Sequence, residues 1–498
     1  MNRRDFTFIV AGAAATKLMA TPLETDPAQA KATQAVLDAV PIAEADPDRP
    51  VYHFHPPANW TNDPNGTLFY RGWHHLFYQL NPFAARLGSQ HWGHARSRDL
   101  VNWEHLPIAI WPSTDKGETA IYSGGAAIAS DGRPRLIYTS IGHPQPEQWM
   151  AIPKDDELIE WQKYEGNPVL AQSAHRAGPI SQWRDPFMFR SQRTTYMVCG
   201  GGTAAGRGQV QLYRATKPDL TRWEHLGVIF QTLDREVRNF ECPNLFPLDG
   251  RWVLIVSAFR PCEYWIGDLD IPRMQFVPTA HGVLDAGDAY ASNISVDDKG
   301  RTLLWLWGRT NTPPDKGWGS VITMPRTLTI GPDGYLRQQP VVEFDSLRGD
   351  VKTVAASPLE KPLDPDGIRT DCAEIEVEFH GGGTYGLELR RSDEGKPGVV
   401  VSMQGPYLNV GTARAYVGFA DRHRLRIFLD KRCIEVFADD GVTAVYNWIN
   451  AGPTDLGIRV FGQAGGGRGP NRGGPPSLQS LRIWPMAAAR FNMDRFRA

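Results

Sequence analysis

Hydrophobic and polar residues alternate along most of the chain in short runs, which is the pattern of half-buried β-strands. Clear runs are TLFYRGWHHLFYQL (67–80), PRLIYTSI (134–141), TTYMVCGG (194–201), RWVLIVSAF (251–259) and RTLLWLWG (301–308). Gly, Pro, Asn and Asp separate these runs, and tight turns need those residues. The pattern predicts an all-β fold built from many short strands.

The strand runs belong to a repeat of about sixty residues. DLVNWEHL and DLTRWEHL are near copies of one segment, and ELIEWQKY is a weaker copy between them. Their tryptophans are 58 and 62 residues apart, at Trp103, Trp161 and Trp223. Sixty residues hold four short strands with loops, and five such units fit between about 48 and 345. A five-bladed β-propeller packs such units around one axis.

One polar motif recurs at the same phase of each unit. Its members are Asp63 in NDPNG, Tyr122 in YSGG, Asp185 in WRDPF, Glu241 in FECPNL and Asp288 in GDAYAS. WTNDPNG (60–66) also fits a simple turn, since Asn, Asp, Pro and Gly favour turns. The innermost strands of a propeller meet around its axis, so we expect Asp63, Asp185 and Glu241 to share one pocket. Three buried carboxylates are costly unless they are paired or used.

The pattern changes after about residue 350. CAEIEVEFH, TYGLELRRS and HRLRIFLDKRCIEVFADDGVTAVYNWI alternate with a period of two residues. This predicts a β-sandwich over 350–498, with GQAGGGRGPNRGGPP (462–476) as a long loop. We expect this domain to support the propeller by packing or to contact glycans.

The N-terminus resembles a twin-arginine export signal. Arg3 and Arg4 precede a short, mildly apolar stretch that is too short and too polar to span a membrane. We expect a signal peptide over 1–30, with AQA at 28–30 as the candidate cleavage site, and a leader or linker over 31–47. The protein would then be periplasmic or extracellular. An ordinary N-terminal helix is the alternative.

Charge and cysteine content exclude several classes of function. The 53 basic and 55 acidic residues give a net charge of −2, so the sequence has no basic signature of nucleic-acid binding. The five cysteines are odd in number and lack metal-binding spacing. The paired histidines (53 and 55, 74 and 75, 91 and 94) suit hydrogen bonds better than a metal site. We expect neither a metal nor a cofactor, and the oligomeric state is not readable.

The ordered motifs resemble glycoside hydrolase family 32, the invertases, inulinases, levanases and related fructosyltransferases. They are HFHPPANWTNDPNG, HLFYQLNPF, HWGHARSRDLVNWEHLPIAI, YSGG, WRDPF and FECPNLF, with a weaker match in CIEVFADDG. The resemblance implies a five-bladed propeller followed by a β-sandwich. It also implies a retaining glycosidase that releases terminal β-D-fructofuranosyl residues from sucrose, inulin or levan.

The resemblance assigns roles to matching positions. Asp63 would be the nucleophile, Glu241 the general acid and base, and Asp185 the stabiliser of the transition state through the sugar hydroxyls. Positions that would line the fructose pocket are Asn62, Gln79, Tyr122, Ser123, Arg184, Cys242, Asp288, Tyr290 and Trp307. Trp92 is a further candidate, as an aromatic platform for the substrate.

The chain departs from the family pattern near the sugar site. Thr61, Leu87 and Leu306 stand where other members of the family commonly have Met, Trp and Gly. Tyr122 stands where they often have Phe. The Leu87 difference leaves the substrate choice open. A fructosyltransferase with the same residues, or a glycan-binding propeller without activity, are the alternatives.

Overall fold

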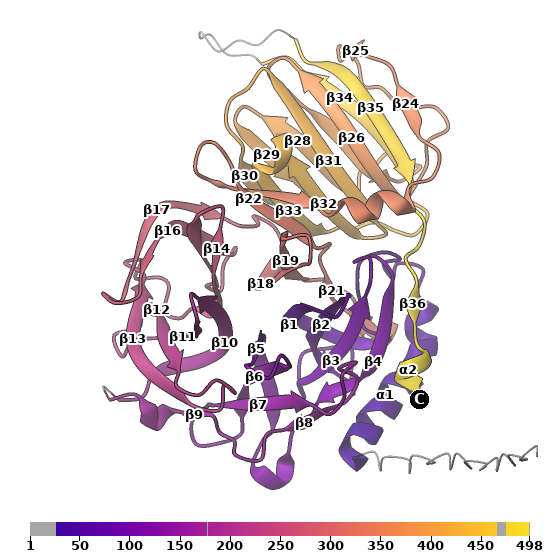
Figure 1. The fold of residues 1–498 in the computed structure, drawn as a ribbon. Coiled ribbons are helices and arrows are strands. Elements are labelled where there is room, and N and C mark those ends of the chain that lie inside the picture. Colours follow the sequence, from indigo (N-terminus) through magenta and orange to yellow (C-terminus); the bar gives the residue numbers. More distant parts are fainter. Residues whose placement is uncertain (1–25, 177, 466–474, 498) are drawn as a thin grey trace, which may run out of the picture.

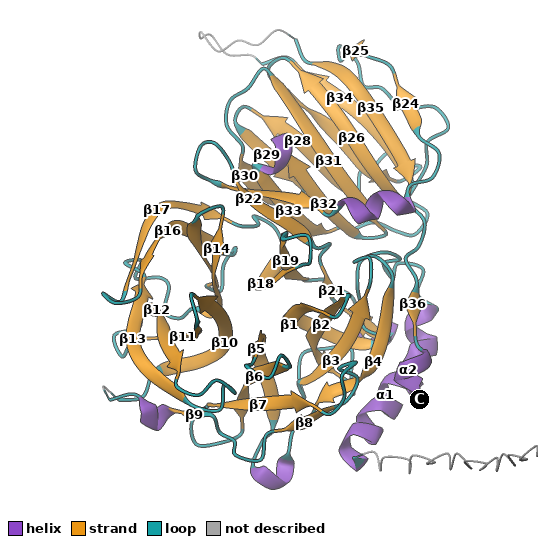
Figure 2. Cartoon of the chain, in the orientation of Figure 1, coloured by secondary structure: helices purple, strands orange, loops and turns teal. Residues whose placement is uncertain are grey.

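The computed structural model describes residues 26–176, 178–465 and 475–497 (Figure 1). Strands form most of its regular secondary structure (Figure 2), as the alternating pattern predicts. Most of the expected signal peptide and the middle of the 462–476 loop lie outside the described residues. No helix in the described ranges is long and apolar enough to cross a membrane.

Five antiparallel sheets form the blades of a propeller, which confirms the predicted fold. Blade 1 holds β1 (Asn59–Tyr70), β2 (Trp73–Asn81), β3 (His91–Ser97) and β4 (Trp103–Ile110). Blade 2 holds β5 (Ala120–Ile128), β6 (Pro134–Ile141), β7 (Glu147–Pro153) and β8 (Trp161–Lys163), with β9 (Leu170–Ala171) beside β7. Blade 3 holds β10 (Ser181–Ser191), β11 (Thr194–Gly202), β12 (Gly208–Ala215) and β13 (Trp223–Gln231).

The last two blades complete the circle. Blade 4 holds β14 (Glu241–Leu248), β15 (Arg251–Ser257), β16 (Glu263–Asp270) and β17 (Gln275–Val283). Blade 5 holds β18 (Ala289–Val296), β19 (Thr302–Gly308), β22 (Arg326–Ile330) and β23 (Leu336–Pro340), with β21 (Val321–Ile322) beside β19. The short strand β20 (Trp318–Gly319) pairs in parallel with β1 and so ties the end of the propeller to its beginning.

The sequence repeat corresponds to the blades. Trp103, Trp161 and Trp223 each begin the fourth strand of a blade and are buried, which fits a packing role. The first strands of successive blades contact one another, from β1 through β5, β10 and β14 to β18, and β18 contacts β1 again. Side chains at the same phase of the five units therefore face one central space.

A β-sandwich follows the propeller. One sheet holds, in spatial order, β24 (Lys352–Val354), β35 (Ser477–Pro485), β26 (Cys372–His380), β31 (Arg422–Asp430), β32 (Cys433–Ala438) and β33 (Thr443–Trp448), with β25 (Ser357–Pro358) beside β35. The other holds β30 (Ala413–Tyr416), β29 (Tyr407–Val410), β28 (Val399–Gln404), β27 (Thr384–Arg391) and β34 (Gly457–Gln463). Aliphatic side chains of both sheets form one core between them.

The two ends of the described chain differ from expectation. Residues 31–47 are mostly helical rather than a linker, because α1 (Pro27–Glu44) presents Ala32, Val36 and Val40 to the propeller core. The Asp26 carboxylate caps this helix. Beyond the sandwich the chain returns to blade 1, where β36 (Phe491–Asn492) pairs with β4 and is followed by α2 (Asp494–Arg497).

A buried ionic cluster joins the two domains. Arg326 of blade 5 lies 2.9 Å from Asp285 and 2.7 Å from Glu435 of the sandwich. His53 lies 2.9 Å from Asp430 and 3.2 Å from Glu435. Burial disfavours the charge on His53, but hydrogen bonds to Asp430 and Glu435 raise its pKa to about 9. The CIEVFADDG motif thus contributes Glu435 to the domain interface.

Candidate active site

All five inner strands bulge at the level of the recurrent polar motif. Their pairing with the second strands shifts register between Thr61 and Pro64, Ile121 and Gly124, Arg184 and Phe187, Glu241 and Asn244, and Tyr290 and Ser292. A β-bulge inserts an extra residue and changes the direction of its side chain. The bulges turn Asp63, Asp185 and Glu241 toward one centre, which explains why turn-forming residues recur in these strands.

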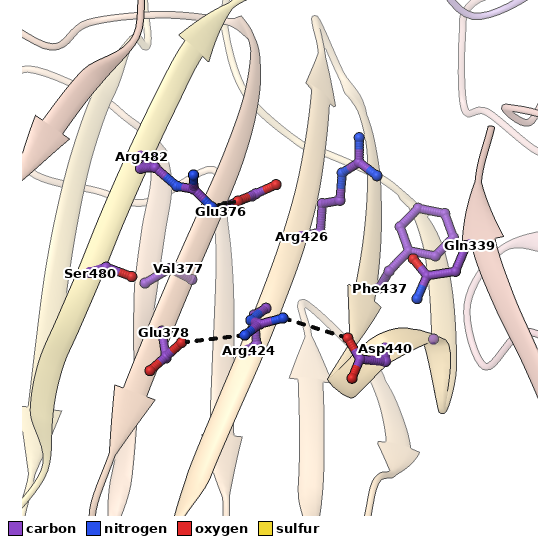
Figure 3. A pocket seen from close by; sticks show the side chains of 11 residues that line it. Gln339, Glu376, Val377, Glu378, Arg424, Arg426, Phe437, Asp440, Ser480 and Arg482 are labelled. Atoms are coloured by element: carbon purple, nitrogen blue, oxygen red, sulfur yellow. Dashed lines mark hydrogen bonds and ion pairs between the residues drawn. The ribbon is translucent and has the colours of Figure 1, made fainter. Parts of the chain in front are cut away.

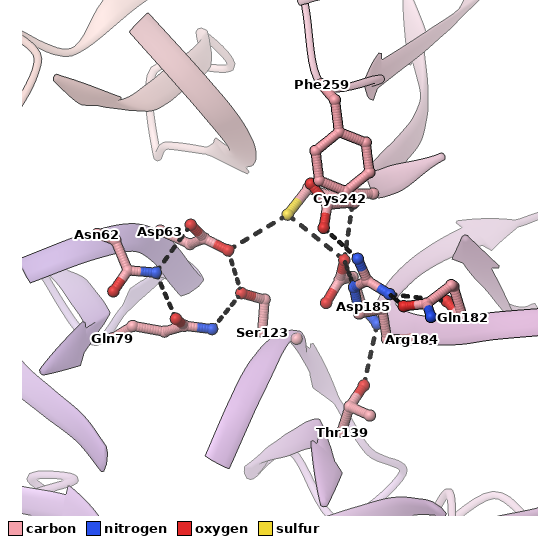
Figure 4. A network of polar contacts seen from close by, with 12 residues as sticks. Asn62, Asp63, Gln79, Ser123, Thr139, Gln182, Arg184, Asp185, Cys242 and Phe259 are labelled. Atoms are coloured by element: carbon pink, nitrogen blue, oxygen red, sulfur yellow. Dashed lines mark hydrogen bonds and ion pairs between the residues drawn. The ribbon is translucent and has the colours of Figure 1, made fainter. Parts of the chain in front are cut away.

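Asp63 is held by side chains from blades 1 and 2 (Figure 4). The Ser123 hydroxyl donates to Asp63 Oδ2 over 2.5 Å, and Asn62 Nδ2 donates to Oδ1 over 3.1 Å. Gln79 accepts a hydrogen bond from Asn62 and donates one to Ser123 Oγ at 2.7 Å. This closed network fixes the orientation of the Asp63 carboxylate.

Glu241 lies at the first position of β14 and meets groups from blades 3 and 5. The Arg184 guanidinium donates to Glu241 Oε1, and the Tyr290 hydroxyl donates to Oε2 over 2.5 Å. Gln182 holds Arg184 by accepting from its Nη1 at 2.7 Å. Both oxygens of the Glu241 carboxyl therefore have a defined partner.

Cys242 links the other two carboxyl groups. Its backbone N–H donates to Asp185 Oδ2 over 3.0 Å, and its thiol lies 3.5 Å from Asp63 Oδ2 and 3.7 Å from Asp185 Oδ2. Asp185 and Cys242 have φ of 62° and 44°, in a region that non-glycine residues rarely adopt and that marks functional sites. The Thr139 hydroxyl accepts from the Asp185 N–H at 2.9 Å. The structure thus brings Asp63, Asp185 and Glu241 into one cluster.

Burial dominates the protonation of the two aspartates. It raises the pKa of Asp63, although hydrogen bonds from Ser123 and Asn62 oppose the change. Burial also raises the pKa of Asp185, to about 7, against the favourable charge of Arg184. Neighbouring carboxylates act in the same direction as burial in both cases.

Asp185→Asn is expected to stabilise the fold in a pH-dependent way. The pKa of Asp185 is about 7 in the folded chain and about 3.9 in an unfolded chain. Folding therefore favours the protonated form, and ionisation costs stability as the pH rises through this interval. The variant should melt about 2–5 °C above the wild type at pH 8 and within about 1 °C of it at pH 4. A difference in Tm that is constant from pH 4 to pH 8 contradicts this assignment.

Two residues expected at the pocket lie elsewhere or act indirectly. Trp92 is fully buried between blades 1 and 2, next to Phe77 and Tyr138. The expectation of an exposed platform is therefore wrong: its indole N–H donates to the Tyr122 carbonyl at 3.2 Å and supports that strand. Asp288 is half-buried at the domain junction, where its carboxylate accepts from the Trp448 N–H at 3.5 Å.

Several residues of the site were not expected from the sequence. Trp60 donates from Nε1 to Asn62 Oδ1 at 3.1 Å, and it stands in the same WTNDPNG motif as Asp63. Gln182 and Thr139 hold Arg184 and the Asp185 backbone, but no motif marks them. Phe259 also joins the site through its N–H, which donates to the Tyr290 hydroxyl at 3.0 Å.

The sandwich has a separate pocket of about 360 Å³ (Figure 3). Its arginines already have carboxylate partners: Arg482 pairs with Glu376, and Arg424 lies 3.7 Å from Glu378 and 3.6 Å from Asp440. The three acids of this pocket, Glu376, Glu378 and Asp440, are thus each paired with an arginine, unlike a set of acids free to act on a substrate. Across the described ranges, no group of three or more His, Cys, Asp or Glu side chains is arranged to hold a metal ion.

Comparison with known proteins identifies the family. The model of the glycosyl hydrolases family 32 N-terminal domain matches residues 53–340, and that of the family's C-terminal domain matches 343–485. The levanase of Bacillus subtilis (strain 168) is 31% identical over 513 aligned residues, covering 90% of this chain and 72% of the levanase. Sucrose-6-phosphate hydrolase of the same organism is 31% identical, covering 82% of this chain and 91% of that protein.

Solved structures agree with this likeness. Fructan 1-exohydrolase IIa from Cichorium intybus superposes with a TM-score of 0.79 at 26% identity, over 90% of this chain and 99% of that one. The family 32 beta-fructofuranosidase of Bombyx mori gives a TM-score of 0.77 at 27% identity, over 93% and 98% of the two chains. This chain is a glycosidase and belongs to glycosyl hydrolase family 32.

Proposed function

We propose that the protein is a retaining β-fructofuranosidase that releases terminal β-D-fructofuranosyl residues from sucrose or fructans. The observation that carries this proposal is the convergence of Asp63, Asp185 and Glu241 from three different blades, each with its own fixed partners. Retaining glycosidases need two carboxyl groups, one as nucleophile and one as acid and base.

The proposed reaction has two steps. Asp63 Oδ attacks C2 of the fructosyl unit while Glu241 gives its proton to the departing glycosidic oxygen. Water then attacks C2, passes a proton to Glu241 and releases fructose and free Asp63. Each displacement inverts C2, so the product keeps the β configuration. Asp185 accepts hydrogen bonds from sugar hydroxyls as positive charge develops on the ring.

The Trp307 side chain offers a further hydrogen-bond donor for a polyhydroxylated ligand. Trp307 is half-buried near Trp60 and Tyr290, and its Nε1 is buried without a hydrogen-bond partner among the described residues. Buried polar groups normally have a partner, so this N–H is suited to donate to a sugar hydroxyl. The relatives support the substrate class, since they include a levanase and a fructan 1-exohydrolase that was also solved in complex with 1-kestose.

Product analysis tests the proposal and separates it from fructosyl transfer. The purified protein is incubated with sucrose, inulin and levan separately, and the released sugars are resolved over time. We expect free fructose from at least one of them. Longer oligosaccharides as the main products would make the protein a transferase, and no reaction on any of the three would refute the proposal.

We also propose export through the twin-arginine route, supported by Arg3 and Arg4 before a short apolar stretch. Replacing both arginines with lysine keeps the charge and should retain the protein in the cytoplasm, whereas the parent chain is found in the periplasm or medium. Equal distribution of the two forms on cell fractionation would contradict this route. Removal of the signal peptide at the candidate cleavage site, after residue 30, would cut the chain within α1 (Pro27–Glu44).

A further inference from the structure

We propose that Phe259 is the aromatic wall on which the leaving-group sugar stacks, an inference that rests on the proposed function. Phe259 follows β15 in blade 4, and its side chain is 70% exposed. Its neighbours Ala258 and Cys262 are buried. An exposed phenylalanine beside the carboxylate cluster is the feature to be explained (Figure 4).

The backbone connects Phe259 to the catalytic centre. The Phe259 N–H donates to the Tyr290 hydroxyl at 3.0 Å, and that hydroxyl donates to Glu241 Oε2 at 2.5 Å. Phe259 has a φ of 60°, which is unfavourable for a bulky side chain. Such strain persists where the surroundings enforce it, and it clusters at ligand sites. Two hydrogen bonds therefore link the Phe259 backbone to the carboxyl that protonates the leaving oxygen.

Both flanks of Phe259 are fixed. The Ser257 hydroxyl and Cys262 thiol lie 3.2 Å apart in a buried contact. Arg260 lies 2.7 Å from Asp234 and pairs with Glu263. A loop that is already ordered loses little conformational freedom when a ligand binds. These contacts therefore hold the backbone that carries the Phe259 ring.

Phe259 extends an aromatic side of the pocket. The Trp60 and Trp307 rings lie 5.9 Å apart, and those of Trp307 and Tyr290 lie 6.3 Å apart. Trp60 and Trp307 are half-buried and Tyr290 is buried, whereas Phe259, whose N–H donates to the Tyr290 hydroxyl, is exposed. Sugar rings have an apolar C–H face that packs on aromatic rings, and aromatic surfaces with a few polar groups are typical of ligand sites.

The position of Phe259 assigns it to the leaving group rather than to the fructosyl unit. It is linked to Glu241, whose proton goes to the departing oxygen, and no hydrogen bond or ring contact connects it with Asp63 in the described structure. Leu87, in the blade 1 loop between β2 and β3, is 60% exposed but aliphatic. The aromatic surface for the departing sugar is then supplied by blade 4 instead of blade 1.

Phe259→Ala is expected to discriminate between leaving groups. We measure kcat/KM for 1-kestose and sucrose, whose leaving groups are sugars, and for methyl β-D-fructofuranoside, whose leaving group is methanol. The variant should lose about tenfold on at least one sugar-leaving substrate, mainly through a higher KM. The loss on the methyl glycoside should be at least about fivefold smaller. Phe259→Trp should retain the wild-type preference.

Phe419→Ala is the matched control. Phe419 has nearly the same exposure, 71%, but lies in the sandwich, so its removal should not change the ratio of the three kcat/KM values. Equal losses on all three substrates, or no loss, in a Phe259→Ala protein with unchanged Tm would overturn the inference. A wild type that cleaves none of them would instead refute the proposed function. If Phe259→Ala is unstable, the three kcat/KM values are measured in Phe259→Leu instead. Equal losses on all three substrates, or no loss, would again overturn the inference.

Discussion

Asp63→Asn is expected to lower kcat/KM on sucrose or fructan by on the order of 10³-fold or more. The amide cannot form the ester with C2, although it can keep one hydrogen bond with Ser123 and one with Asn62. The fold should survive, because the change is nearly isosteric and removes a charge that burial disfavours. Steady-state rates and thermal melting of the purified variant provide the measurement.

Asp298→Asn is a suitable control for this substitution. Asp298 is exposed in the turn after β18, the inner strand of blade 5, and its replacement should leave the rate within about twofold of wild type. Near-normal turnover by Asp63→Asn would show that Asp63 is not the nucleophile. A collapse of Tm in that variant would show that the loss reports folding instead.

Glu241→Ala should lose a similar factor, but in a way that depends on the leaving group. A poor leaving group such as glucose needs the proton from Glu241, whereas an activated one departs without it. In the variant, azide can enter the vacated space and attack C2 of the fructosyl-Asp63 ester. We therefore expect azide to restore the rate only with an activated fructoside and to give β-fructosyl azide.

The outcome with unactivated sucrose is the critical one. Rescue of sucrose cleavage by azide would contradict the role of Glu241 as proton donor, because azide supplies no proton. Glu241→Gln provides a comparison that retains the size of the side chain. Its Oε1 can still accept from Arg184 while its Nε2 donates to the Tyr290 hydroxyl. A comparable loss in Glu241→Gln would therefore be due to the missing proton and not to the missing volume.

The repeat made the propeller and its acid cluster predictable. A period near sixty residues fits four strands per unit, and the first strands of the units meet around the axis. Asp63, Asp185 and Glu241 were found in this way because each stands beside turn residues within an inner strand. The bulges that turn these residues toward the centre were not foreseen, since register shifts depend on pairing with the second strand.

The remaining features depend on contacts between distant segments. The burial of Trp92 is decided by Tyr138 of blade 2, which sequence alternation in β3 cannot show. The helix over 27–44 is stabilised by packing against blade 1. Its own pattern of hydrophobic residues is weak, and for that reason the sequence predicted a linker there. Phe259 resembles any strand residue in RWVLIVSAF, and only its exposure and φ distinguish it.

Trapping the covalent intermediate tests the central claim most directly. Glu241→Gln is mixed with a fructoside that carries an activated leaving group, quenched in acid at the end of the first turnover, digested and analysed by mass spectrometry. The account predicts that the peptide containing Asp63 gains the mass of one fructosyl unit and that fragmentation places it on Asp63. A burst of leaving group with the adduct on Asp185 or another residue, or with no adduct, would contradict it.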